Sequence, residues 1–293
     1  MRLVPSDEQR GFAAVLHDLL SEGPPTWEKL GEVGVTGLVP DATAADLVVA
    51  CEEFGHHAVE GPVAESIAAV PALLAGLDNP WSAELAAGRL VATLAAPPRQ
   101  PLAADTDRAG LILLADGDRL RHGVVETVHD SMHPGRTVAS LRGGELIGVR
   151  QSGPALDLGC LACSAQLLGA GRALLERSVK YATVRTQFGR PIGSFQAVRH
   201  GLADVAVALE FARPLLHAAA VTLDPRDVSA AKVACGDAAL LAARQALQVH
   251  GALGYTREYG LGRWLTLVRV LHASWGTAAW HRDRILTSLG GRP

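Results

Sequence analysis

The fold of this chain is decided by the stretch Arg185-Thr-Gln-Phe-Gly-Arg-Pro-Ile-Gly-Ser-Phe-Gln-Ala-Val-Arg-His-Gly-Leu-Ala-Asp204. A helical pattern leads into Arg185, and Gly189 and Pro191 end it, since glycine favours a turn and proline cannot continue a helix. Ser194 can then cap a second helix that begins near residue 195. The stretch therefore predicts a tight corner between two helices.

The side chains at this corner suit a phosphate-bearing ligand. A guanidinium at Arg185 can hold a pyrophosphate through paired charged hydrogen bonds. Phe188 adds a flat apolar surface, and Gln187 adds an amide for further contacts. An ordinary corner between two helices is the alternative interpretation, because glycine, proline and serine are common in turns of every function.

The same stretch resembles the signature of the acyl-CoA dehydrogenase family, Arg-x-x-Phe-Gly-x-Pro-Ile-x-x-x-Gln followed by Ala-Asp. A second segment, Gln248-Val-His-Gly-Ala-Leu-Gly-Tyr-Thr-Arg-Glu-Tyr259, resembles the family's Gln-x-x-Gly-Gly-x-Gly-Tyr-x-x-Glu block, with Ala252 at its second glycine. Trp27 to Pro40 and Cys51 to Pro62 resemble the family's first helical domain more weakly. The resemblance implies FAD as cofactor. It also implies a set of residues that contact the pyrophosphate and adenine of a neighbouring subunit's flavin: Arg185, Gln187, Phe188, Gln248 and Gly251.

Hydrophobic periodicity divides the chain into three parts. Residues 1–87 show short helical patterns broken by glycine and proline, and residues 88–150 show short apolar runs between turn signals. Residues 151–293 contain four long helical patterns, over 156–185, 195–221, 228–249 and 261–289, which predict a bundle. The expected fold is mostly α with a small β domain: an N-terminal helical domain, a short β domain and a C-terminal four-helix bundle. The resemblance implies the same order.

Composition excludes several classes of function. The net charge is −3 and no basic block stands out, so a nucleic acid is not an expected partner. We find no N-terminal apolar stretch and no apolar run expected to span a bilayer, so we expect a cytoplasmic protein without membrane contact.

No metal is expected. Cys160 and Cys163 form a Cys-x-x-Cys pair within an apolar helix, without a second pair, and are expected to be buried thiols. His56 and His57 with Glu52 and Glu53 are expected to be a solvated helix end.

The family's usual catalytic positions are empty. The commonest catalytic glutamate precedes a Gly-Thr pair, and in Ala273-Ser-Trp-Gly-Thr-Ala-Ala279 that place holds Trp275, whose indole cannot accept a proton. Other members carry the base in a Leu-Asp-Leu-Glu-like stretch, where Leu156-Asp-Leu-Gly159 has Gly159. The loop that would hydrogen-bond the flavin ring reads Ala92-Thr-Leu-Ala-Ala-Pro-Pro-Arg99 and lacks most polar partners. Ala279 also replaces a polar flavin contact.

Three explanations remain. In the first, the chain is a subunit of a heteromeric acyl-CoA dehydrogenase, expected as an α2β2 tetramer. A homologous partner then supplies the glutamate and the ring loop. The resemblance to bacterial enzymes of this kind suggests a bulky, steroid-type CoA thioester as substrate. Alternatively, it is a self-sufficient flavoenzyme with a relocated base, or a non-catalytic binding or scaffolding homologue. The side chains to test as a relocated base are Asp130, Asp157, Asp237, Glu258, His250 and His272.

Overall fold

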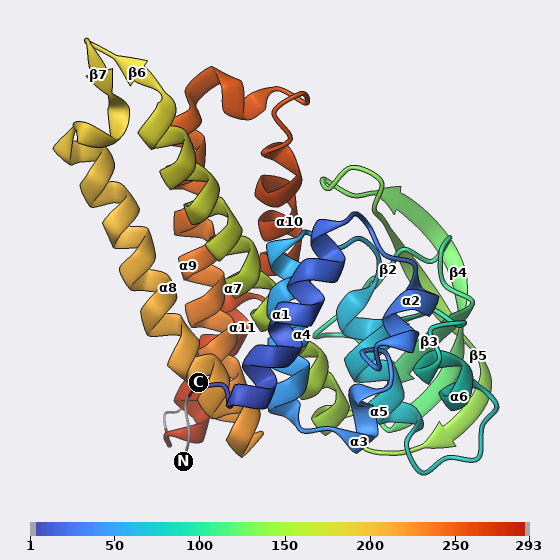
Figure 1. Cartoon of the computed structure of the whole chain (residues 1–293). Coiled ribbons are helices and arrows are strands. Elements are labelled where there is room, and N and C mark those ends of the chain that lie inside the picture. Colours follow the sequence, from blue (N-terminus) through green and yellow to red (C-terminus); the bar gives the residue numbers. More distant parts are fainter. Residues whose placement is uncertain (1–3, 291–293) are drawn as a thin grey trace.

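The computed structural model describes residues 4–290, except for the side chains of residues 40 and 41. Seven helical segments come first, then five strands, then the long helices (Figure 1). The first helical segments are α1 (Asp7–Ser21), α2 (Trp27–Glu32), α3 (Leu38–Asp41), α4 (Ala44–His56), a π-helical turn (Glu65–Ala69), α5 (Val70–Leu74) and α6 (Trp81–Ala86). This order confirms the expected fold class, whereas the exact domain boundaries stay a prediction.

Side-chain caps fix the starts of the two longest N-terminal helices. Ser6 and Gln9 form a reciprocal capping box at α1, and Thr43 and Asp46 form another at α4. Each box satisfies backbone N–H groups that have no partner within the helix. The positions of α1 and α4 are therefore set by local sequence as well as by packing.

The sheet has the strand order β1-β3-β4-β5-β2. Its strands are β1 (Ala92–Ala95), β2 (Ala103–Ala104), β3 (Leu111–Asp116), β4 (Arg119–Asp130) and β5 (Thr137–Val149). β1 and β3 are parallel, and the other pairs are antiparallel. Figure 1 shows the sheet on the side of the molecule opposite α8, with α1 and α4 between them.

The C-terminal part packs closely because small residues line the helix contacts. Its helices are α7 (Gly153–Val184), α8 (Gln196–Thr222), α9 (Pro225–His250), α10 (Gly262–Ala273) and α11 (Ala278–Ser288). A Cβ atom at Gly55 would lie 2.0 Å from the carbonyl oxygen of Gln166, and one at Gly169 would lie 1.8 Å from that of Glu52. Only glycine at these two positions lets α4 and α7 approach backbone to backbone.

Three expectations about these helices are wrong. The pattern over 261–289 is two helices, because Trp275 and Gly276 adopt positive φ angles of 60° and 95° and break it. Ser194 does not cap α8: its hydroxyl donates to the Pro191 carbonyl, and Phe195 precedes the helix without a side-chain cap. By length and composition α7 and α8 are apolar enough to cross a membrane, contrary to our estimate. In α7, 83% of that apolar window is buried within the protein, as befits a core helix; in α8 only 39% is.

The four cysteines are buried and lie on three helices of the interior. Cys51 is on α4, Cys160 and Cys163 are on α7, and Cys235 is on α9. Burial raises the pKa of the Cys163 thiol to about 12. The expectation of buried thiols for Cys160 and Cys163 is confirmed.

Candidate functional site

The corner predicted at Arg185 is a small hairpin that projects beyond the helices (Figure 1). β6 (Thr186–Gln187) pairs with β7 (Arg190–Pro191), and the turn between them has positive φ angles at Phe188 (54°) and Gly189 (78°). Positive φ at both central residues is the geometry of tight hairpin turns. Because Gly189 supplies one of them without strain, the turn forms and places Phe188 at its tip, with 91% of its surface exposed.

The residues expected to contact a neighbour's flavin, here called the anchor residues, are all exposed: Arg185, Gln187, Phe188, Gln248 and Gly251. Arg185, Gln187 and Gln248 are exposed, and their side chains make no hydrogen bond to any residue in the range 4–290. The rings of Phe188 and Phe195 meet edge to face, with centroids 6.1 Å apart. A guanidinium, an amide and an aromatic face left open in this way fit contacts with a phosphate-bearing molecule outside this subunit.

Tyr181 joins the two family blocks. Its carbonyl accepts the backbone N–H of Arg185, and its ring stacks on His250 at 4.5 Å. His250 ends α9, and Gly251 follows with a φ angle of 58°, which a residue with a Cβ rarely adopts. The structure therefore brings Gln248 and Gly251 to the same end of the bundle as Arg185. Ala252, at the family's second glycine, is exposed.

The two predicted base positions face each other. Trp275 is 1% exposed, and its indole lies directly over Gly159, where an added Cβ would be 2.3 Å from two ring carbons. The backbone N–H of Trp275 donates to the side-chain oxygen of Gln100 at 2.7 Å, and the backbone carbonyl of Trp275 is 2.9 Å from Nε2 of His281. These bonds hold the backbone in its left-handed conformation. The indole thus fills the space where a carboxylate from either position would be.

Sequence inspection missed Glu65, a buried acid near this indole. It begins the π-helical turn, it is 3% exposed, and burial raises its pKa to about 7. Glu65 lies in an apolar sequence context, Val-Ala-Glu-Ser-Ile-Ala-Ala, which is the signal that identifies a buried acid. Raised carboxyl pKa values are found at functional sites and in buried structural groups alike.

The ring-loop segment is apolar and closed. β1 is fully buried, and Thr93 there has a buried hydroxyl without a hydrogen-bond partner among the described residues. Arg99, at the end of the segment, binds Asp157 at 2.7 Å and packs over Trp280. Arg284 binds Asp157 from the other side through both carboxylate oxygens. Asp157 is thus held between two guanidiniums and is not available as a base.

The remaining candidates for a relocated base do not converge. Asp237 pairs with Arg282 on the surface, and Asp130 and Glu258 are exposed. His250 is held by the Ala246 carbonyl and the Tyr259 hydroxyl, and His272 packs near Gly236. Nothing brings these five side chains to the Trp275–Gly159 contact.

The histidine pair at the end of α4 differs from our expectation. His56 and His57 are not a solvated helix end: they are largely buried beside Glu53, and α1 brings His17 to the same place. The sequence separation between α1 and α4 concealed this cluster.

Comparison with known proteins gives one consistent result. Residues 148–290 match the family model for the C-terminal domain of acyl-CoA dehydrogenases. The acyl-CoA dehydrogenase IpdE2 of Mycolicibacterium smegmatis is 30% identical over 85% of this chain and 82% of its own length.

Solved structures show the same fold at low sequence identity. The ChsE4-ChsE5 complex from Mycobacterium tuberculosis contains a chain that matches with a TM-score of 0.86 and 21% identity over all of both chains. A Mycobacterium smegmatis glutaryl-CoA dehydrogenase in complex with FADH2 matches with a TM-score of 0.86 and 17% identity, over 99% of this chain and 96% of its own. The Tcur3481-Tcur3483 steroid ACAD variant matches with a TM-score of 0.83 and 19% identity, over 97% of this chain and 98% of its own. Sequence relatives, family model and motifs agree, and the chain belongs to the acyl-CoA dehydrogenase family.

Proposed function

We propose that this chain is one subunit of a heteromeric, FAD-dependent acyl-CoA dehydrogenase and that a homologous partner carries the catalytic glutamate. The observation that carries the proposal is the Trp275–Gly159 contact, because one indole occupies both places where the family's base acts. The anchor residue Arg185, by contrast, is exposed, and its side chain makes no hydrogen bond to any of the residues 4–290. The chain has therefore kept the half of a flavin site that serves a neighbour.

The fit of FAD differs between the two halves of its site. Arg185, Gln187, Gln248 and Gly251 would hold the pyrophosphate and adenine of a flavin whose ring lies in the partner, with Phe188 against its flat groups. The buried, apolar β1 segment offers the ring no comparable donors. When bound, FAD would supply an acceptor for the hydride of the substrate's β-carbon, and a carboxylate of the partner would take the α-proton to leave an α,β-unsaturated thioester. This chain's part is to bind and orient the cofactor.

Two further observations support a partner and its substrate class. The outer face of α8 exposes an apolar stripe at a helical spacing of four: Val207 (54% exposed), Phe211 (73%) and Leu215 (43%). The matching solved structures include complexes of two different chains, one of them described as a steroid enzyme. We propose an α2β2 tetramer acting on a bulky, steroid-type CoA thioester.

The test is assembly and flavin content. Co-expression with a homologous chain that keeps the glutamate is expected to give a tetramer with two copies of each, by native mass measurement, and one FAD per unlike pair, by absorbance. A flavin-loaded homotetramer of this chain that oxidises an acyl-CoA on its own would contradict the proposal. In that case Glu65 would be the first base to test, because its carboxyl is buried near Trp275 with a pKa near neutrality.

A further inference from the structure

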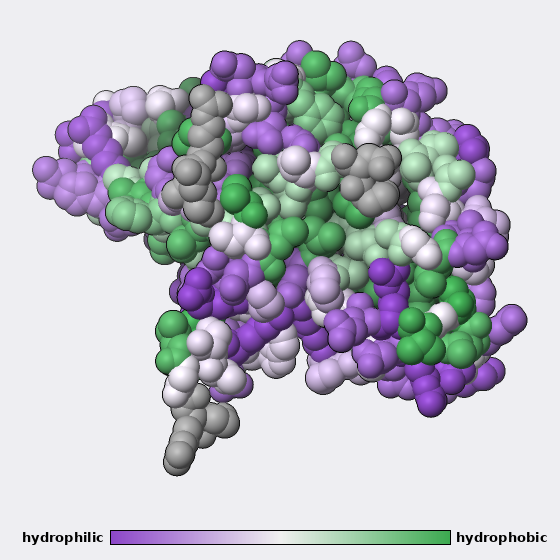
Figure 2. Space-filling model, turned by 90° about the horizontal axis from the view of Figure 1, so that it is seen from below, coloured by the Kyte–Doolittle hydropathy of each residue, from purple (hydrophilic) through white to green (hydrophobic). Residues whose placement is uncertain are grey.

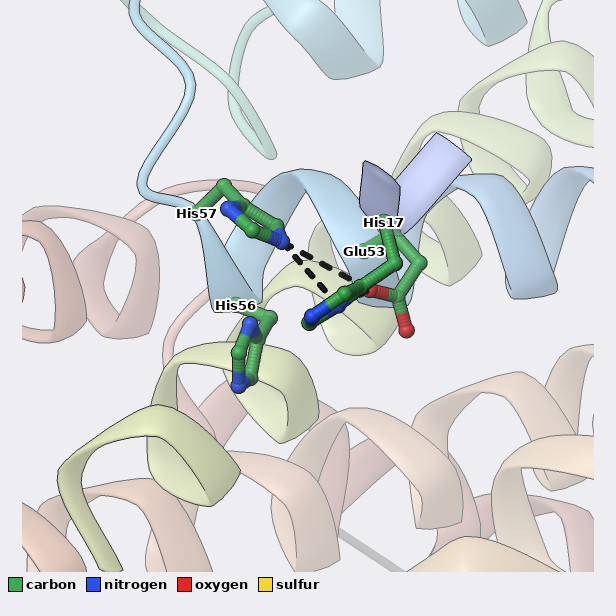
Figure 3. Close-up of side chains that lie close together, drawn as sticks. All are labelled: His17, Glu53, His56 and His57. Carbon is green, nitrogen blue, oxygen red and sulfur yellow. Dashed lines mark hydrogen bonds and ion pairs between the residues drawn. The ribbon is translucent and has the colours of Figure 1, made fainter. Parts of the chain in front are cut away.

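Four side chains from two helices converge in a cluster that includes neither the anchor residues nor Trp275. His17 comes from α1, Glu53 and His56 from the last turn of α4, and His57 from the residue that follows (Figure 3). One potential metal-binding atom from each residue lies within 4.8 Å of every other. Three imidazoles and a carboxylate at such separations form a set of four potential ligands.

Their spacing is close to that of a tetrahedral metal shell. Nδ1 of His17 is 2.9 Å from Oε2 of Glu53 and 3.1 Å from Nε2 of His57, and the last two atoms are 3.9 Å apart. Ligand atoms bound to zinc at about 2.0–2.1 Å in a tetrahedron are roughly 3.3–3.4 Å from one another. Small side-chain rotations therefore suffice to bring these atoms to bonding distance of one ion.

Hydrogen bonding alone does not satisfy the cluster. Nδ1 of His17 carries either one hydrogen or one lone pair in the ring plane, so it can form only one good hydrogen bond. It nevertheless faces both Glu53 and His57 at hydrogen-bond distance. A cation between the three atoms would engage the lone pairs of both imidazoles and of the carboxylate together.

His56 is prepared in the manner of a metal-binding histidine. Its Nε2 is 2.8 Å from Oε2 of Glu176, on α7, while its Nδ1 is buried and has no partner among the described residues. Histidine ligands commonly bind the metal through one nitrogen and a carboxylate through the other, which fixes the ring. An unsatisfied buried ring nitrogen beside three other potential ligands is the second, independent sign of a site.

The surrounding charges leave room for a cation. Arg172 binds Glu53 through Oε1 at 2.6 Å, so Oε2 still faces the histidines. Glu52, Glu53 and Glu176 pair with Arg172 and Arg213, so three carboxylates face two guanidiniums.

An entry path also exists. His57 lines a cavity of about 620 Å³, and His17 is partly exposed. Arg177 also lines this cavity, and its positive charge is held over the ring of Trp264, with the guanidinium carbon 3.8 Å from the ring centroid.

We propose that His17, Glu53, His56 and His57 bind one divalent transition-metal ion, zinc being the test ion, which ties α1 to the end of α4. Imidazole nitrogens favour zinc and its neighbours over magnesium and calcium. Four protein ligands fill a tetrahedral shell, so the role is structural and leaves no open position for catalysis. The proposal is independent of the flavin chemistry above.

The experiment uses the full chain, with its partner where the two co-purify. After chelator treatment, it is dialysed against ZnCl2, and its metal content and zinc affinity are measured by mass spectrometry of the metal and by calorimetry. We expect one zinc ion per chain. His17→Ala should weaken binding at least tenfold, and Glu176→Gln should weaken it by about 10- to 100-fold, because the Glu176 carboxylate orients the ring of His56.

His129→Ala, an exposed histidine on β4, is the matched control and should bind zinc as the unaltered chain does. Zinc should also raise the melting temperature of the unaltered chain and of the control, but not that of His17→Ala. An unaltered chain that takes up no zinc would overturn the proposal, whatever the variants do. Equal zinc affinity of the chain and its folded His17→Ala variant would overturn it as well.

Discussion

The indole of Trp275 lies against the backbone of Gly159, so close that a methyl group on Gly159 would be 2.3 Å from two of its ring carbons. The two residues come from the α10–α11 break and from α7. Each accounts for the other, because a tryptophan at 275 leaves space only for hydrogen at 159. The two residues that the motifs predict at the base positions are therefore parts of one packing arrangement.

Gly159→Ala should lower the free energy of unfolding by about 1–3 kcal/mol, the usual cost of overpacking a core. Urea denaturation measures it. Gly153→Ala is the control, because a Cβ there meets nothing within 4 Å in the same helix. Adding Trp275→Ala should remove the penalty of Gly159→Ala, and additive losses in the double variant would show that the two residues do not compete for space.

Arg185→Ala should weaken FAD binding by the assembled enzyme about ten- to a hundredfold, since a lost charged hydrogen bond costs about 1.5–3 kcal/mol. Flavin titration of the co-purified complex measures this. Arg142→Ala, an exposed arginine on β5, should leave the affinity unchanged.

Trp275→Phe should leave turnover by the complex nearly unchanged, because an indole has no proton-accepting role in the cleft of this subunit. Steady-state rates on the folded complex test this expectation. Normal flavin content in Arg185→Ala together with an inactive Trp275→Phe enzyme would refute the division of the site between two subunits.

Phe211→Ser should weaken assembly, because it removes the most exposed member of the apolar stripe on α8. A buried Phe side chain contributes about 1.5–3 kcal/mol, so the dissociation constant should rise roughly ten- to a hundredfold. Analytical ultracentrifugation gives the value. Met132→Ser changes an apolar side chain of similar exposure near the sheet and serves as control; an equal effect would place the interface elsewhere.

Glu65 should make stability depend on pH in an unusual direction. Burial raises its pKa from 4.5 to about 7, so between these values the folded protein holds a proton that the unfolded chain has lost. Stability from this group is therefore complete below about pH 4.5 and is lost as the pH rises through 7.

The side chain of Gln in Glu65→Gln cannot ionise. The difference in free energy of unfolding between this variant and the unaltered protein should therefore shift in favour of the variant by on the order of 3 kcal/mol between pH 5 and pH 8. Urea denaturation at the two pH values measures the gain. The buried His57 and His281, whose pKa values are lowered, act at acid pH in both proteins and cancel. The exposed Glu126→Gln should show no such difference.

The sequence was most informative where function and local geometry coincide. The turn at Phe188 and Gly189 and the end of α9 at Gly251 follow from glycine and proline chemistry, so both family blocks were found at their correct places. The motif positions also predict that Trp275 and Gly159 replace the family's bases. Their mutual contact was beyond reach, because it joins residues more than a hundred positions apart through tertiary packing.

The other failures have the same origin. The break at Trp275 depends on a left-handed backbone that the distant Gln100 and His281 of α11 hold in place, and no local pattern reports it. The histidine cluster requires α1 to lie on α4. Local periodicity gives helices and their ends, whereas contacts between distant helices depend on which small residues allow close approach.

Leu286, in the last turn of α11, and Leu289, just after it, are exposed, and Figure 2 shows hydrophobic residues among hydrophilic ones on the face seen from below. The four cysteines, by contrast, are all buried, on α4, α7 and α9. A thiol-specific reagent can reach them only after these helices separate, because buried thiols are inert. The rate of alkylation therefore measures how fast these helices open. Sequencing the labelled peptides would show whether Cys51 is uncovered before Cys235, and so whether the N-terminal helices leave the core first.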